Sequence, residues 1–403
     1  MKFAHLADMH IGSWREPKLR DLSVNAFIKA MDLCIERNVD FIIISGDLFN
    51  TSLPAIDNLK TAVKKLKEIK NKNIPVYIIA GSHDFSPSGK TMLDVLEEAG
   101  LFINAARGEE KDGKLRLKFT VDPKTGAKIT GLLGKKGTLE KGYYELLDRA
   151  ALEKEQGYKI FVFHTALTEL KTEDLEAMES IPFSLLPKNF NYYAGGHVHE
   201  VIEKKEKDYG LIAYPGPLFP NSFLELEKLH NGGFYIVEDD KLSYEPIQIC
   251  PVLSLTINCD NKTPEEINEM LLKEIKNKEF NNTIVTIRLE GMLERGKPSS
   301  IDFKIIFEKL YEKSAYFVMK NTNKLSSREF EETKVEVTSV EETEEKLIKE
   351  HLGQIKVEGL SLEKEKSLIK SLMKVLGAEK GEGEKIADFE KRIKEEISKM
   401  IEI

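Results

Sequence analysis

The 403-residue sequence has little cysteine, little glutamine and no long apolar run. Its cysteines, Cys34, Cys250 and Cys259, lack the spacing of a metal site or a redox pair, so we expect reduced thiols in a cytoplasmic protein. No apolar run approaches the length needed to cross a bilayer. His5 and Asp8 interrupt the N-terminus too early for a signal peptide. These observations predict neither a membrane protein nor a secreted disulfide scaffold.

The composition is that of a globular protein, with 41% hydrophobic and 32% charged residues. The formal net charge of −8 argues against a protein that coats nucleic acid by bulk electrostatics. It does not exclude a local basic groove, because binding depends on how the charges are distributed. Charge alone therefore leaves the substrate open.

Short apolar runs alternate with helical patterns over residues 1–249, which predicts an α/β domain with layered sheets. The strand-like runs lie at residues 3–7, 41–45, 76–80, 159–163 and 192–194, and helices are expected near 19–37 and 54–70. A hairpin-like pattern closes this domain at residues 234–237 and 242–249.

A second, smaller α/β unit is expected at residues 250–322, with strands and helices in alternation. Its first helix has a clear start signal, because Thr263 fits the N-cap, Pro264 the first helical position and Glu266 the end of a capping box. Residues 323–345 are polar and charged and are expected to form a linker.

Residues 346–403 show helical apolar stripes, interrupted by Gly377, Gly381 and Gly383. One reading is a self-packed helical hairpin. The other is a module that docks on a partner helix or coiled coil, since two short helices bury little surface by themselves. The sequence leaves both open.

Polar residues that suit catalysis follow or end the five apolar runs of the first domain. In an open α/β sheet the carboxyl ends of the strands line one crevice, so these residues are expected to meet there. The clusters are Asp8-Met9-His10, Gly46-Asp47, Gly81-Ser82-His83-Asp84, His164, and Gly195-Gly196-His197-Val198-His199.

Imidazoles and carboxylates without thiolates favour a divalent ion such as zinc, iron or manganese over a structural zinc site. Six such ligands are too many for one ion and suit two ions about 3.5–4 Å apart. They are Asp8, His10, Asp47, His164, His197 and His199. The glycines before Asp47, His83 and His197 are expected to allow tight turns.

Three other histidines are expected to have no role in the metal site. His5 lies within a predicted strand and is expected to be a packed neighbour rather than a ligand. His230 and His351 are expected to be ordinary surface residues.

Together these motifs resemble the calcineurin-like metallophosphoesterase superfamily, over residues 1 to about 200. Within it the chain is similar to the Mre11/SbcD family of DNA double-strand-break repair nucleases. The strings that carry this resemblance are MKFAHLADMHIG, SGDLFNTSLP, AGSHD, GGHVHE and AYPGPLFPNSFLE, followed by a small capping domain and a helical C-terminus.

The resemblance implies two manganese ions per chain, one held by Asp8, His10 and His199 and the other by His164 and His197. Asp47 would bridge them, and His83 would stabilise the transition state or protonate the leaving sugar oxygen. The implied activities are double-stranded 3′-to-5′ exonuclease and single-stranded endonuclease.

The resemblance also implies partners. Residues 250–322 would help to grip DNA, with Trp14-Arg15 and Lys135-Lys136 as weak candidates for contact. The C-terminal helices would dock on the coiled coil of an SMC-like ABC ATPase of the Rad50/SbcC type. A homodimer formed through segments 54–70 and 91–98 would give a heterotetramer, associated with the nucleoid.

Two positions depart from the family pattern. Ser82 stands where the family has asparagine, so a shorter hydroxyl replaces a metal-binding amide oxygen. Asn50 stands where relatives often have a histidine associated with exonuclease function. These departures keep two alternatives open: a weakly catalytic or non-catalytic DNA-end scaffold for the ATPase, and a phosphodiesterase acting on small molecules.

Overall fold

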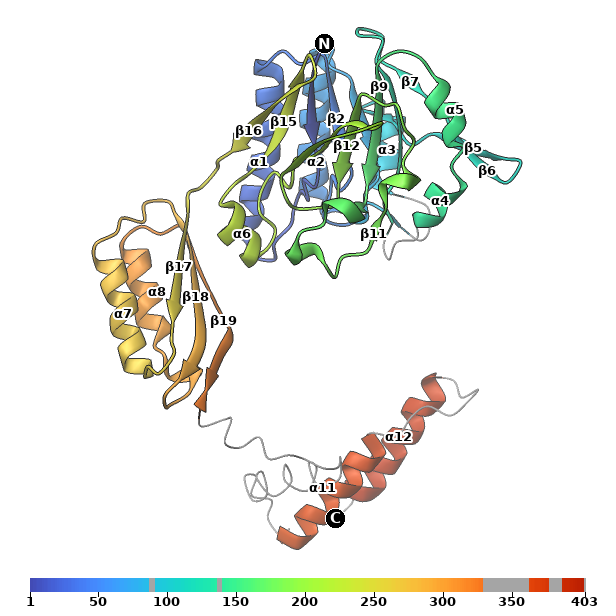
Figure 1. Cartoon of the computed structure of the whole chain (residues 1–403). Coiled ribbons are helices and arrows are strands. Elements are labelled where there is room, and N and C mark those ends of the chain that lie inside the picture. Colours follow the sequence, from blue (N-terminus) through green and yellow to red (C-terminus); the bar gives the residue numbers. More distant parts are fainter. Residues whose placement is uncertain (87–90, 136–139, 329–361, 377–385, 402–403) are drawn as a thin grey trace. The chain divides into compact units, whose positions relative to one another are not determined.

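The computed structural model in Figure 1 describes residues 1–86, 91–135, 140–328, 362–376 and 386–401. The chain divides into two compact units, Met1–Ser326 and Ser327–Ile403. No helix in the described parts is long and apolar enough to cross a membrane.

A six-stranded sheet carries the N-terminal motifs of the first unit. Its strand order is β16-β15-β1-β2-β3-β4; strands β1 to β4 run parallel, and β15 and β16 are antiparallel additions. The strands are β1 Lys2–Leu6, β2 Phe41–Ser45, β3 Val76–Ile79, β4 Ile103–Asn104, β15 Gly232–Glu238 and β16 Lys241–Ile247.

A second six-stranded sheet has the order β13-β14-β12-β9-β8-β7. Its strands are β7 Thr120–Val121, β8 Lys128–Leu132, β9 Lys159–His164, β12 Tyr192–Gly196, β13 Ile202–Glu206 and β14 Gly210–Tyr214. Two short pairs accompany it, formed by β5 Gly108–Lys111 with β6 Lys114–Leu117 and by β10 Ala166–Leu167 with β11 Ser180–Ile181.

The two sheets pack face to face, which side-chain alternation along the strands makes possible. Phe3, Phe41 and Ile43 point into a core shared with Ile160 and Val162 of the second sheet. The intervening residues of β1 and β2 face the opposite way, into a core with helices α1 Pro17–Glu36, α2 Ile56–Asn71 and α3 Met92–Glu98. Helices α4 Lys141–Leu146, α5 Arg149–Lys154 and α6 Phe223–Leu229 complete this part.

The predicted layered α/β fold is confirmed, and the strand ends converge from two sheets rather than along the edge of one open sheet. The five motif-bearing strands belong to two sheets, β1, β2 and β3 to one and β9 and β12 to the other. All five are apolar runs buried on both faces, and such runs do not reveal which strands pair.

A three-stranded sheet with two helices follows. Its strands are β17 Val252–Asn258, β18 Ile284–Leu293 and β19 Phe317–Ser327, and its helices are α7 Pro264–Lys276 and α8 Phe303–Glu312. The predicted capping box of α7 is present, with the Thr263 side chain accepting from the Glu266 backbone N–H. Residues 323–327, expected to begin the linker, instead lie in β19, where Leu325 and Ser327 are buried.

The second unit contains α11 Leu362–Leu376 and α12 Ile386–Ile401, which contact each other. Gly377, Gly381, Gly383, His351 and most of the predicted linker lie outside the described residues.

Candidate metal centre

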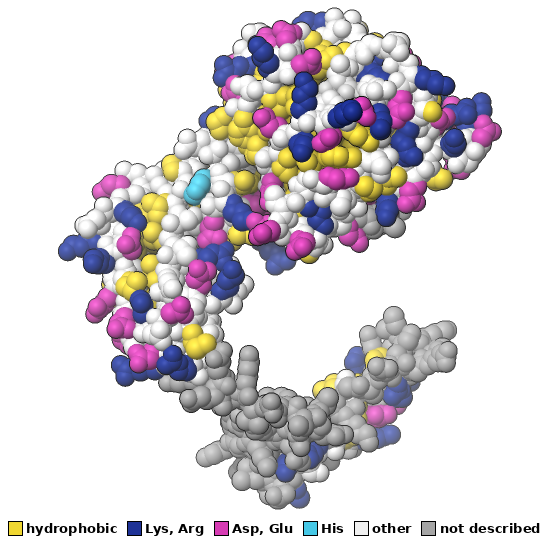
Figure 2. Space-filling model, in the orientation of Figure 1, with side chains coloured by type: hydrophobic (Ala, Val, Ile, Leu, Met, Phe, Trp, Pro, Cys, Tyr) yellow, Lys and Arg dark blue, Asp and Glu magenta, His cyan; other side chains and the backbone are white. Residues whose placement is uncertain are grey.

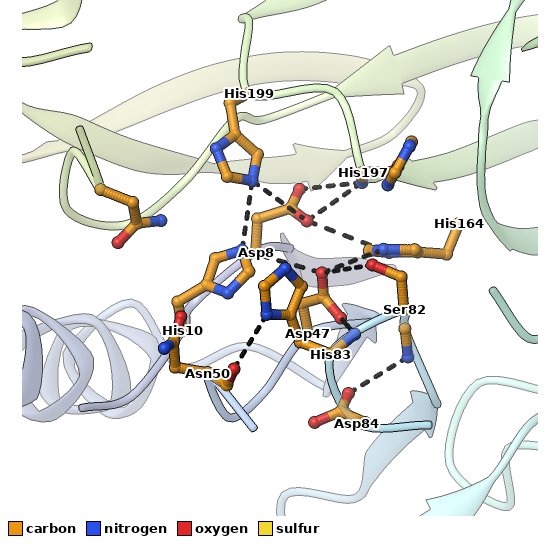
Figure 3. A network of polar contacts seen from close by, with 12 residues as sticks. Asp8, His10, Asp47, Asn50, Ser82, His83, Asp84, His164, His197 and His199 are labelled. Atoms are coloured by element: carbon orange, nitrogen blue, oxygen red, sulfur yellow. Dashed lines mark hydrogen bonds and ion pairs between the residues drawn. The ribbon is translucent and has the colours of Figure 1, made fainter. Parts of the chain in front are cut away.

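Five strand ends from the two sheets bring the predicted side chains into one polar cluster (Figure 3). The turns after β1, β2 and β3 carry Asp8 and His10, Asp47, and Ser82 and His83 respectively. From the other sheet, β9 ends on His164 and β12 leads into His197 and His199.

The backbone of this cluster is strained at the functional residues themselves. Asp8, His10, Asp47 and His197 all have positive φ angles, of 48°, 42°, 53° and 85°. Such conformations cost roughly 1–3 kcal/mol each and persist where the surrounding structure enforces them. The side chains of these residues all lie in one cluster (Figure 3).

Three glycines make room for these turns, but only Gly46 does so by adopting a backbone conformation that other residues avoid. Gly46 has a φ of +89°, and a Cβ atom there would lie 2.3 Å from Nδ1 of His164. Gly81 and Gly196 are needed for close approach instead, since a Cβ would lie 2.3 Å from the backbone N of Asp47 and 2.0 Å from the Ser45 carbonyl oxygen. The turns are therefore packed tightly, against a side chain at Gly46 and against backbone atoms at Gly81 and Gly196.

Possible ligand atoms form three overlapping groups, each with its members within 4.8 Å of one another. Asp8 groups with His10 and His199, and Asp8 also groups with Asp47 and His164. The third group joins His10 and Asp47 with His83. Shared carboxylates between neighbouring groups are the arrangement that two adjacent cations require.

Hydrogen bonds to one ring nitrogen orient three of the imidazoles. Nδ1 of His164 lies 2.7 Å from the Ser45 carbonyl oxygen, and Nδ1 of His83 lies 2.8 Å from the Asn50 carbonyl oxygen. Nδ1 of His199 lies 3.2 Å from Oε1 of Glu225. Since carbonyl and carboxylate oxygens only accept, Nδ1 donates in each case, and Nε2 is the nitrogen that faces the cluster and could bind a metal or carry a proton.

The Nε2 atom of His164 supplies a test of whether a cation fits. It is fully buried, has no hydrogen-bond partner among the described residues and lies 3.2 Å from Oδ2 of Asp47. Burial by itself lowers the pKa of His164, but the charges of Asp47 and Asp8 and the hydrogen bonds to Asp47 and Ser45 together outweigh it and raise that pKa to about 10. A positive charge between these two atoms is thus favoured, and a divalent ion can take the place of the proton.

Burial also sets the charge of two other rings. It lowers the pKa of His10 well below its usual value and, together with the nearby His164, lowers the pKa of His197 to about 4. Both imidazoles are therefore neutral at neutral pH, the form in which histidine binds a metal.

The calcineurin-like phosphoesterase family matches residues 1–201. The chain is 32% identical to the DNA double-strand break repair protein Mre11 of Archaeoglobus fulgidus, over 57% of this chain and 52% of that protein. Its identity to the Mre11 protein of Methanopyrus kandleri is 31%, over 62% and 57% of the two chains. The chain is a calcineurin-like phosphoesterase of the Mre11 family. The matched segment spans just over half the length of these relatives, and 75% of the Mre11 protein of Saccharolobus solfataricus, at 28% identity.

The residues that differ from the Mre11-family pattern both lie in the cluster. Oγ of Ser82 donates to Oδ2 of Asp47 at 3.4 Å. Asn50 contacts His83 through its backbone carbonyl, which any residue at this position could supply. The interpretations of His5 and His230 are confirmed, since His5 is buried between Tyr192 and Ser45 and His230 is exposed.

Two further residues orient this cluster: Asp84, which the sequence analysis placed in a cluster without a role, and Glu225, which it missed. Asp84 accepts hydrogen bonds from the backbone N–H groups of Leu48, Phe49 and Gly81, so it ties the turns after β2 and β3 together. Glu225 holds His199, and its spacing from Ser222 is the capping signal that could have indicated it.

The cluster opens into a cavity of about 350 Å³. The cavity is lined in part by residues of the cluster, namely Asp47, Ser82, His83, His197 and His199. Its apolar lining residues are Leu175, Met178, Leu224 and Leu229. An ion pair between Lys228 and Asp174 bridges α6 and the segment after β10 at this cavity. A phosphate ester could thus reach the candidate metal ligands, with a less polar group against the apolar wall.

Proposed function

We propose that this chain is a manganese-dependent DNA nuclease acting in double-strand-break repair, with double-stranded 3′-to-5′ exonuclease and single-stranded endonuclease activities. One observation carries the proposal: buried carboxylates and imidazoles form overlapping groups of possible ligands, and Nε2 of His164 lies buried 3.2 Å from Oδ2 of Asp47. The names of the relatives, DNA double-strand break repair proteins, indicate the substrate class.

In this proposal Asp8, His10 and His199 hold one ion, His164 and His197 hold the other, and Asp47 bridges. Divalent ions here would supply Lewis acidity, charge stabilisation at phosphorus and a lowered pKa for water. The ring of His197 lies 5.1 Å from that of His164, between centroids, and this proximity supports the two as ligands of one ion.

His83 is the proposed acid for the leaving oxygen. Its Nδ1 donates to the Asn50 carbonyl oxygen, so Nε2 is the atom available to hold and release a proton. His83 lines the cavity, and its backbone N–H donates to Oδ1 of Asp47 at 2.7 Å, which fixes the residue beside the ligand cluster. A positioned proton donor of this kind lowers the barrier for departure of an alkoxide.

DNA contact in this proposal relies on local features rather than on a bulk positive field. On the face shown in Figure 2, Lys and Arg side chains are interspersed with Asp and Glu side chains, in keeping with the net charge of −8. We propose residues 250–322 as the unit that grips DNA beside the nuclease domain of residues 1–249.

The direct test is cleavage of end-labelled duplex and single-stranded DNA with manganese, comparing the natural chain with Ser82→Asn. We expect the natural chain to cut, because the Ser82 hydroxyl holds the Asp47 carboxylate in place. The longer amide should reach the second ion and raise metal affinity and cleavage by up to about 10-fold.

Cutting only after asparagine is restored would instead identify the natural chain as a DNA-end scaffold. The same assay decides the second alternative, a small-molecule phosphodiesterase, which the partly apolar cavity of about 350 Å³ favours. Turnover of nucleotide phosphodiesters without DNA cleavage would establish that alternative and sink the nuclease proposal.

We propose that α11 and α12 dock on the coiled coil of a Rad50/SbcC-type SMC-like ABC ATPase. The two helices contact each other, yet Leu368, Leu372, Ile393 and Ile397 are only half-buried. A helical pair that leaves its apolar stripes this open gains stability from a further helix.

Removing residues 340–403 should abolish binding to such an ATPase and leave manganese binding unchanged, because the ligands all lie in the first unit. Co-elution with the ATPase on size-exclusion chromatography measures the first effect, and calorimetric titration with manganese the second. A truncated chain that still co-elutes would place the docking surface elsewhere.

We also propose a homodimer formed through α2 and α3. Ile56 at the start of α2 is 81% exposed, Leu53 just before it is 70% exposed, and Val95 of α3 is 55% exposed. The two segments are adjacent, since the Met92 backbone N–H donates to the Ser52 carbonyl oxygen. Exposed apolar side chains gathered in this way mark an association surface.

Ile56→Glu should shift the dimer towards monomer by at least about 10-fold in dissociation constant, since a charge would replace an apolar contact at the centre of this surface. Sedimentation equilibrium measures the shift. Val121→Glu is the matched control: Val121 is similarly exposed, at 52%, but lies on β7. An equal effect of both variants would contradict the assignment.

A further inference from the structure

Helix α6 carries two glutamates on opposite sides: Glu225 contacts His199, and Glu227 contacts Arg288. Successive residues of an α-helix are about 100° apart, so the side chains of Glu225 and Glu227 diverge by roughly 200°. Leu226 between them is fully buried in the core that α1 and α2 share with the first sheet. This buried leucine fixes the rotation of the helix, so a shift of one glutamate moves the other.

Glu225 reaches the metal centre. Its Oε1 lies 3.2 Å from Nδ1 of His199, whose Nε2 lies 3.1 Å from Nε2 of His10 and 3.8 Å from Oδ1 of Asp8. The same carboxylate accepts from the Asn221 backbone N–H at 2.8 Å and from the Ser222 hydroxyl at 3.1 Å. Glu225 is thus locked by its own helix cap while it holds a ligand ring.

Glu227 reaches the β17–β19 sheet. It accepts a forked contact from Arg288 of β18, with Nε 3.0 Å from both carboxylate oxygens and an NH2 group 2.5 Å from Oε2. The two side chains, of Arg288 and Glu227, are only 15% and 11% exposed, and the guanidinium also lies 5.3 Å from the ring centroid of Phe223 in α6. Planar, largely buried pairs of this type hold their geometry better than exposed ones.

We propose that Glu225 is a positioning residue for the ligand His199, and that the Arg288–Glu227 pair makes its position depend on the β17–β19 sheet through α6. This inference rests on the proposed function only in taking His199 as a metal ligand. The β17–β19 sheet, which is expected to grip DNA, would then also help to hold the metal site of Asp8, His10 and His199.

The test measures manganese binding to the full chain by electron paramagnetic resonance and calorimetry, with no DNA present. Glu225→Ala should weaken the site of Asp8, His10 and His199 by about 10–100-fold, the usual effect of losing a carboxylate behind a ligating histidine. Glu225→Gln keeps an oxygen that can accept from Nδ1 of His199, so it should retain most of the affinity. Both variants should leave the site of His164 and His197 unchanged.

Arg288→Gln should weaken the same site by about 5-fold or more, the range of a modest coupling between sites. Adding Glu227→Gln should cost little further, because both changes remove one pair. Arg37→Gln is the matched control: it breaks the 3.0 Å pair with Glu245, which lies on β16 rather than α6, and should leave both sites unchanged.

Unchanged affinity in Glu225→Ala would overturn the positioning role, and equal loss at both sites would show only general damage to the fold. An effect of Arg288→Gln no larger than that of Arg37→Gln would overturn the link to the sheet. A natural chain that binds manganese with this pattern but does not cut DNA would sink the nuclease proposal and leave this inference standing. If the natural chain binds no manganese, both the nuclease proposal and this inference are refuted.

Discussion

Replacing His83 with alanine should slow manganese-dependent DNA cleavage by about 10²–10⁴-fold while manganese affinity stays unchanged. The reason is geometric: Nδ1 of His83 is committed to the Asn50 carbonyl oxygen, and the residue lines the cavity beside Asp47. Its remaining nitrogen is therefore placed to pass a proton. Single-turnover cleavage of an end-labelled duplex measures the loss.

A matched pair of measurements separates this role from metal binding. Imidazole added to His83→Ala should restore part of the rate if the side chain acts as a proton donor. The structure also allows a different result, because His83 forms one of the possible ligand groups with His10 and Asp47. Loss of manganese affinity in the variant would make His83 a ligand and refute the proposed role.

Gly46→Ala should have the second large effect, on both stability and the metal site. Alanine would have to adopt a φ near +89°, and its Cβ would fall 2.3 Å from Nδ1 of His164 and 2.9 Å from Cα of Gly81. Backbone strain and overpacking together should lower the free energy of unfolding by about 2–6 kcal/mol. Displacement of His164 should weaken manganese binding by at least about 10-fold.

Chemical denaturation and manganese titration measure these two effects. Gly142→Ala is the control: a Cβ atom at Gly142 in α4 would meet open space among the described residues, so alanine should stabilise the chain by about 0.5–1 kcal/mol. A Gly46→Ala protein as stable as Gly142→Ala, with full metal affinity, would show that the turn after β2 is not tightly packed.

Local sequence was enough to place most elements that carry the centre. The run at residues 41–45 is strand β2 without adjustment, and the runs at 76–80 and 159–163 differ from β3 and β9 by one residue each. The start of α7 was also predictable, because Thr263 and Glu266 satisfy each other within one turn. Signals of this kind act between neighbours in the chain and need no tertiary contact.

Hydrogen-bond partners that lie far apart in the sequence could not be predicted from local sequence patterns. Glu225 holds His199 from 26 residues away, and Arg288 holds Glu227 from 61 residues away. Residues 323–327 look like linker because they are polar, but pairing with the neighbouring strand makes them part of β19. The hydrogen bonds of a sheet are made by the backbone, so side-chain polarity alone could not reveal them.

The sequence by itself determined the types of the candidate ligands, their order and their position at strand ends, because metal chemistry selects residue types and apolar runs mark buried strands. Only the tertiary structure decided that two sheets meet at the centre, that Asp8, His10, Asp47 and His197 bear the strain, and which oxygen orients each imidazole. Those features depend on the packing of segments far apart in the chain, where a few tenths of an ångström decide which contacts form.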